Sequence, residues 1–163
     1  MTMQKMATCL WFDGQAEEAV RFYTSIIKGS KVLSTARYGK EGAKASGRPE
    51  GSIMTITFEL NGQEFMALNA GPEFSFNPAI SFMLYCDTQE EVDYLWDKLS
   101  EGGEPWECGW LRDKYGVAWQ IVPTILEKLM DGSDPVRAER LMKAMVQMRK
   151  MDIAKLQEAY DQG

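Results

Sequence analysis

The chain has 163 residues, a formal net charge of −6 and no histidine. The acidic balance argues against nucleic-acid binding, because phosphate backbones require a basic protein face. The lack of histidine excludes Ser-His-Asp and Cys-His nucleophile systems, and it removes the commonest ligand of zinc, iron and nickel. Cys9, Cys86 and Cys108 lie far apart without a CxxC motif, which favours buried thiols in a reducing cytoplasm.

Hydrophobic segments are short throughout the chain. The N-terminal residues lack the apolar core of a signal peptide, and no stretch reaches the ~20 apolar residues that a membrane span needs. We therefore expect a soluble, cytoplasmic protein without a membrane partner.

The first half of the chain predicts the order β-α-β-β-β. Asp13-Gly14 stops the first apolar run, and Asn61-Gly62 is a strong signal for a two-residue hairpin turn. The segment before the third strand is rich in Gly, Lys, Ala, Ser and Pro and is expected to be a loop. The expected elements are strands over residues 3–12, 31–38, 52–60 and 63–69, a helix over 16–27, and this loop over 39–51.

The second half predicts the same order after a connector over residues 70–78. Asp87 and Glu90 have the spacing of a capping box at the start of the helix. Gly102-Gly103 ends that helix. The expected elements are strands over residues 79–86, 104–108, 110–114 and 117–122, and a helix over 90–99.

The two halves also match residue by residue. Leu10-Trp11-Phe12-Asp13 corresponds to Leu84-Tyr85-Cys86-Asp87, at an offset of 74 (87 minus 13) by the strand ends and 73 (90 minus 17) by the helices. Such order indicates an internal duplication. We expect an α+β fold over residues 1–123, in which two tandem βαβββ modules (3–69 and 79–123) form a curved mixed sheet around a cleft.

Residues 124–163 predict a C-terminal helical extension. Asp134-Pro135 is a typical helix start, and Leu141, Met142, Met145 and Met148 recur at helical spacing. The Met-rich face has two interpretations, packing on the domain or contact with a second copy, and both stay open.

Three motifs resemble the vicinal oxygen chelate superfamily, which contains glyoxalase I, bleomycin-resistance proteins and extradiol dioxygenases. The closest similarity is to its PhnB-like branch, labelled 3-demethylubiquinone-9 3-methyltransferase-like. The resemblance implies the βαβββ fold and a homodimer. The motifs are residues 10–23 with Asp13-Gly14-Gln15, residues 68–82 with Asn69-Ala70-Gly71-Pro72, and residues 108–123 with Trp119-Gln120-Ile121-Val122-Pro123.

Metal-dependent relatives place ligands on the first, fourth, fifth and eighth strands. By position, the resemblance puts these ligands at Thr8 (or Cys9), Asn69 (or Ala67), Ser81 and Gln120. Hydroxyl and amide oxygens without an anionic partner bind transition metals weakly. We therefore expect no metal and no cofactor. S-adenosylmethionine is also not expected, because no glycine-rich GxGxxG loop follows the first strand.

The polar set suggests binding of a small molecule in the cleft. Thr8, Asn69, Ser81 and Gln120 would orient the ligand, and the aromatic residues Trp11, Phe82, Trp110 and Tyr115 would supply apolar walls. Two alternatives stay open: the polar groups satisfy one another and a few waters, or the chain is a lyase- or transferase-type enzyme, with or without metal. Trp119, next to Gln120, is expected to face the core.

Overall fold

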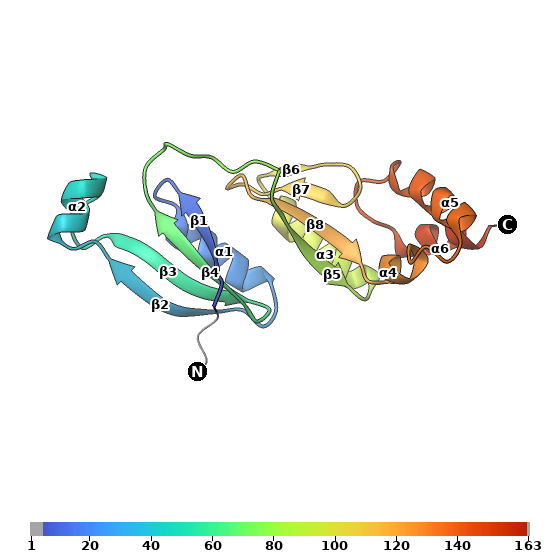
Figure 1. The fold of residues 1–163 in the computed structure, drawn as a ribbon, viewed down its shortest axis with the longest axis horizontal. Coiled ribbons are helices and arrows are strands. Elements are labelled where there is room, and N and C mark those ends of the chain that lie inside the picture. Colours follow the sequence, from blue (N-terminus) through green and yellow to red (C-terminus); the bar gives the residue numbers. More distant parts are fainter. Residues whose placement is uncertain (1–4, 163) are drawn as a thin grey trace. The chain divides into compact units, whose positions relative to one another are not determined.

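The computed structural model describes residues 5–162, which fall into two units, the first ending at Phe76 and the second beginning at Asn77. Each unit contains one four-stranded mixed sheet with a helix packed on one face (Figure 1). This is the predicted α+β class with two βαβββ modules.

The first sheet has the strand order β1-β4-β3-β2, in which β1 and β4 are parallel and the other pairs antiparallel. Asn61 and Gly62 have φ values of 49° and 83°, so the predicted hairpin turn between β3 and β4 is confirmed. The elements are β1 (Thr8–Phe12), α1 (Ala16–Ile26), β2 (Lys31–Arg37), α2 (Lys40–Ser46), β3 (Ile53–Leu60) and β4 (Gln63–Asn69). Residues 3 and 4 of the expected first strand lie outside the described residues.

The second sheet repeats this arrangement with the order β5-β8-β7-β6, and β5 is parallel to β8. Three helices follow the last strand within the same unit. The elements are β5 (Ser81–Cys86), α3 (Gln89–Ser100), β6 (Glu104–Pro105), β7 (Trp110–Arg112), β8 (Ala118–Pro123), α4 (Ile125–Leu129), α5 (Pro135–Met145) and α6 (Ile153–Asp161).

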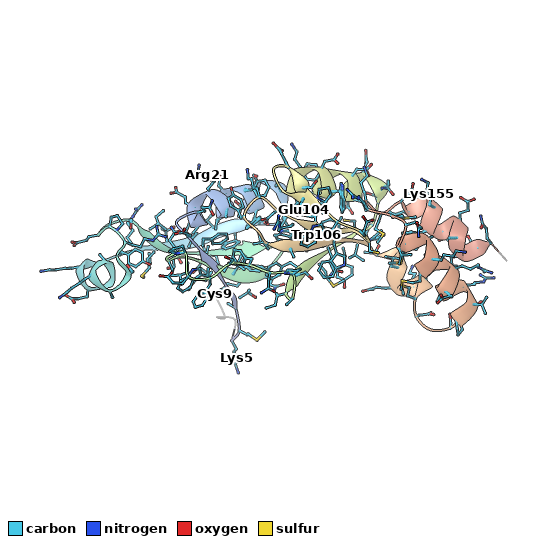
Figure 2. The ribbon with its side chains drawn as sticks, turned by 90° about the horizontal axis from the view of Figure 1, so that it is seen from above. Lys5, Cys9, Arg21, Glu104, Trp106 and Lys155 are labelled. Atoms are coloured by element: carbon cyan, nitrogen blue, oxygen red, sulfur yellow. The ribbon has the colours of Figure 1, made fainter. Side chains whose placement is uncertain are left out.

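Alternation along the strands gives each sheet an inner face, which its helix covers, and an open face on the other side. In the first unit, Val20 and Tyr23 of α1 are buried together with Phe58 and Phe65, whose rings stack at 5.5 Å. Figure 2 shows Cys9 and Arg21 on opposite sides of this sheet, Arg21 with α1. The inner face is therefore the core of the unit, and the open face is free of that helix.

The second unit has the same division. Trp119 and Leu111 are almost fully buried on the inner face together with Val92 and Leu99 of α3. The prediction that Trp119 serves the core is confirmed. Phe82 lies 5.4 Å from the Trp119 ring, so it also belongs to the inner face and not to the wall that we expected.

Three expectations about local structure are wrong. Residues 40–46 of the expected loop form α2, which buries none of its residues, so no apolar periodicity could reveal it. The strand expected over 104–108 ends at Pro105, and Cys108 has a φ of 57°, outside strand geometry. The helix cap is Thr88, whose Oγ1 accepts from the Glu91 amide, rather than Asp87.

The C-terminal segment packs on the second unit. Leu141, Met151 and Leu156 are buried. The Cys108 amide donates to the Met148 carbonyl and the Gly109 amide to the Arg149 carbonyl, both at 2.8 Å. Gln89 joins the same segment to α3, because its side chain bonds both the Met151 carbonyl and the Ile153 amide. Across residues 5–162, no helix has the length and apolar character needed to cross a membrane.

Candidate functional site

The open face of the second sheet brings together three of the six predicted site residues. Gln120 of β8 pairs with Trp110 of β7 on one side and with Met83 of β5 on the other. Its Nε2 donates to Ser81 Oγ at 2.8 Å. The structure thus places Ser81, Trp110 and Gln120 in one group on one face.

Apolar side chains surround this polar pair. Met83 and Tyr85 point to the same face from β5 and are 45% and 51% exposed. Trp110 is half-buried. A polar pair beside partly exposed aromatic and thioether groups is the composition of a small-molecule surface, with few polar groups set in an apolar lining. Tyr115, expected as a further wall, lies in the turn between β7 and β8.

Trp11 and Thr8 belong to opposite faces of the first sheet. Thr8 pairs with Phe65, which is buried on the inner face. Trp11 lies on the open face, where its Nε1 donates to the Gly71 carbonyl at 2.9 Å and its ring meets Phe74 edge-on at 4.9 Å. The expectation that these two residues share one surface is not met.

Asn69 is engaged in the structure of the first unit. Its Oδ1 accepts from the Ala16 amide at 2.8 Å, and its Nδ2 donates to the Ile53 carbonyl at 3.1 Å. It is 8% exposed and lies on the inner face, where it holds the start of α1 against the sheet and lines a cavity at that end of the unit. Ala67, the alternative for this position, is buried on the same face.

The strand registers show which residues of the first sheet occupy the equivalent open-face positions. Cys9 pairs with Met66 as Met83 pairs with Gln120, so Met66 is the counterpart of Gln120. Glu59 and Glu64 also point to this open face and pair with each other across β3 and β4. From the sequence we expect both carboxylates to be solvated side chains near the ends of their strands, and in the structure both are half-buried. Glu59 lies 3.5 Å from Lys31 Nζ.

These side chains do not suit the metal centre that the superfamily implies. Ser81, Gln120, Cys9 and Met66 offer hydroxyl, amide, thiol and thioether groups, and none is a carboxylate or imidazole. Cys9, which we expected to be a buried thiol, is exposed, although partial desolvation raises the pKa of its thiol. Among residues 5–162, no three Cys, Asp or Glu side chains gather in a group that could hold a metal ion.

Asp113 organises the turn that supports the site strand β8. It is 2% exposed, and its Oδ1 accepts from the amides of Tyr115 at 2.8 Å and Val117 at 3.0 Å. Its Oδ2 accepts from Trp119 Nε1 at 2.8 Å. Because Trp119 and Gln120 are adjacent, this carboxylate anchors the strand that carries Gln120. In the sequence Asp113 is part of the motif over residues 108–123, and no local signal there indicates this role.

The chain is similar in sequence to a known protein family and to several solved structures. Residues 4–122 match the family described as 3-demethylubiquinone-9 3-methyltransferase. The solved structure of a Bacillus cereus protein, described as a 3-demethylubiquinone-9 3-methyltransferase, PhnB protein, is 40% identical. That likeness covers 74% of this chain and 100% of that chain, with a TM-score of 0.66.

Two solved structures with lower sequence identity are similar to this chain in fold alone. A Pseudomonas aeruginosa protein is 22% identical over 74% of this chain and 98% of its own, with a TM-score of 0.59. The fosfomycin resistance protein FosX from Mesorhizobium loti is 12% identical over 80% of this chain and 99% of its own, with a TM-score of 0.51. Among curated proteins, none matches this chain.

Proposed function

This chain belongs to the 3-demethylubiquinone-9 3-methyltransferase family, and we propose that it binds a small aromatic molecule with adjacent oxygen atoms, without a metal ion. The site is the open face of the second sheet. The observation that carries the proposal is the hydrogen bond between Gln120 Nε2 and Ser81 Oγ on that face, next to Trp110 and Met83.

The polar pair keeps hydrogen-bonding capacity for a ligand. Gln120 Oε1 is an acceptor, and the Ser81 hydroxyl is a donor, because Ser81 Oγ accepts from Gln120 in the observed bond. Two adjacent ligand oxygens can therefore donate to one side chain and accept from the other. Trp110, Met83 and Tyr85 supply the apolar contact for an aromatic ring.

The family name mentions methyl transfer to a demethylated quinone, and we carry over only the quinone-like ligand class. Nucleotide-type methyltransferases hold their cofactor at a glycine-rich loop after the first strand of a parallel sheet. Here β1 is parallel to β4 alone, and Asp13-Gly14-Gln15 leads directly into α1. We propose binding without S-adenosylmethionine.

Titration with catechol tests the proposal. In buffer with EDTA, catechol should quench the fluorescence of the wild-type protein, and its dimethyl ether, which cannot donate a hydrogen bond, should bind more weakly. Gln120→Ala and Ser81→Ala should each weaken catechol binding by about tenfold, because one hydrogen bond contributes about 1.4 kcal/mol.

The matched control is Gln157→Ala, which removes the same side chain from α6, where its Nε2 donates to the exposed Asp161 carboxylate. This variant should bind catechol as the wild type does. Equal affinity in all three variants would refute the assigned site. Binding that requires added nickel, zinc or manganese would refute the metal-free mode, and a stabilising effect of S-adenosylmethionine alone would refute the ligand class.

We also propose a homodimer, as the resemblance implies. Large apolar side chains remain exposed in the second unit, and helix α5 carries two of them, Val136 and Met142, which favours a partner surface. Outside the proposed ligand site they are Ile80, Tyr94, Met130, Val136, Met142 and Val146. Light scattering at micromolar concentration should give twice the mass of one chain, and a mass of one chain under those conditions would contradict the proposal.

A further inference from the structure

The first unit contains a cavity that none of the residues of the proposed ligand site lines. Its volume is about 370 Å³, within the range of small-molecule sites. It lies where β2 ends, where the chain leaves α2, and where the turn after β1 enters α1. In Figure 1, α2 lies beyond the ends of β2 and β3, so this part of the unit is built from loops and helix ends.

Two arginines from different segments line this cavity. Arg37 ends β2, and its Nη1 donates to the Gly51 carbonyl at 3.0 Å. Arg48 follows α2, and its Nη2 donates to Asp13 Oδ1 at 2.8 Å. A guanidinium has five N–H donors, so each of these contacts uses only a part of its capacity. The remaining donors suit the planar oxygens of a carboxylate or phosphate.

The position of Arg48 depends on a glycine. A Cβ atom on Gly14 would lie 2.9 Å from Arg48 Nη1, and Gly14 has a φ of +81°. The backbone conformation favours glycine, and a Cβ at this position would displace the tip of the Arg48 guanidinium. With Asp13 on one side and Gly14 beneath it, the Arg48 side chain is held in place and is only 25% exposed.

The other charges at the cavity are already paired. Asp13 bonds Arg48, and the carboxylate of Glu17, which also lines the cavity, bonds Arg21 at 3.2 Å. Arg37 has no carboxylate among its described contacts. Among the residues that line the cavity, Arg37 and Arg48 exceed the single carboxylate of Glu17 by one positive charge. The first turn of α1, fixed by Asn69 at the cavity wall, carries the positive end of the helix dipole together with the carboxylates of Glu17 and Glu18.

We propose that this cavity binds a small organic anion through a carboxylate or phosphate group held by Arg37 and Arg48. The site is independent of the open face of the second sheet, because its lining residues all belong to the first unit. Arg37 contributes a positive charge that no carboxylate among its described contacts neutralises. Arg48, bonded to Asp13, presents its guanidinium to the anion in a defined orientation.

Nuclear magnetic resonance titration of the full chain with citrate and with inorganic phosphate tests this inference. Sodium chloride at equal ionic strength serves as the baseline. We expect the Gly14 amide and the Arg48 Nε–Hε signals to shift saturably with at least one of the two anions. A response to phosphate alone assigns a phosphate ligand, and a response to citrate alone assigns a carboxylate ligand.

Arg37→Gln should weaken the binding by about tenfold, as expected for loss of one charge-assisted contact. Arg48→Gln should do the same, and because it also breaks the pair with Asp13, Arg37→Gln is the decisive variant. The matched control is Arg149→Gln, which removes the same charge from an exposed pair with Glu107 in the second unit. Equal weakening in Arg37→Gln and Arg149→Gln, or shifts that sodium chloride reproduces, would overturn the proposal.

Discussion

Replacing Asp113 with alanine is expected to lower the free energy of unfolding of the second unit by about 3 to 5 kcal/mol. The change removes the acceptors of two backbone amides and of Trp119 Nε1, all inside the turn that precedes β8. Each buried donor left without a partner costs about 1–3 kcal/mol. Urea denaturation followed by tryptophan fluorescence measures the loss.

Two further variants isolate the cause. Asp113→Asn keeps one acceptor oxygen, so it should lose less stability than Asp113→Ala. Asp97→Ala removes an exposed carboxylate from α3 in the same unit and should change stability by less than about 0.5 kcal/mol. If Asp113→Ala were as stable as Asp97→Ala, the carboxylate would not hold the turn.

Gly109→Ala is expected to destabilise the second unit by about 3 kcal/mol and to loosen its C-terminal segment. Gly109 has a φ of +78°, and a Cβ there would lie 2.7 Å from the Ile121 carbonyl and 3.2 Å from Met151 Cγ. The same residue donates its amide to the Arg149 carbonyl. Hydrogen exchange should therefore accelerate at the amides of Cys108 and Gly109, alongside a lower urea midpoint.

Gly47 provides the comparison, because it has a similar φ of +73° and no atom within 4 Å of its Cβ position. Gly47→Ala should cost only the backbone conformation, about 1 kcal/mol. The difference between the two variants isolates the steric contact with β8 and Met151. Equal losses at both positions would show that the contact with the C-terminal segment contributes nothing.

The modular fold could be predicted because its signals are local and repeated. Asp13 and Asp87 end equivalent strands, and Asn61-Gly62 has the φ values that only a few residue types adopt readily. Helix α2 could not be predicted, since it buries no residue and has no apolar stripe. The left-handed backbone conformation of Cys108 could not be predicted either, because cysteine has no preference for positive φ.

The candidate site was predictable only in part, for a geometric reason. Ser81, Trp110 and Gln120 share a face because their strands are in the register that the repeat implies. Thr8 and Asn69 were assigned from an offset uncertain by one residue, and one residue moves a side chain to the opposite face. Two other features could not be predicted, because the segments involved come together only through loop conformation. They are the hydrogen bonds of Asp113 and the position of Arg37 and Arg48 around one cavity.

The central claim is that the Gln120–Ser81 pair receives a small ligand without a metal ion. The most direct test follows the nuclear magnetic resonance signal of the Gln120 side-chain amide while catechol is added to the full chain in the presence of EDTA. We expect a saturable shift of this signal together with the indole signal of Trp110. Catechol binding that leaves both signals unchanged, or that begins only when nickel, zinc or manganese replaces EDTA, would contradict it.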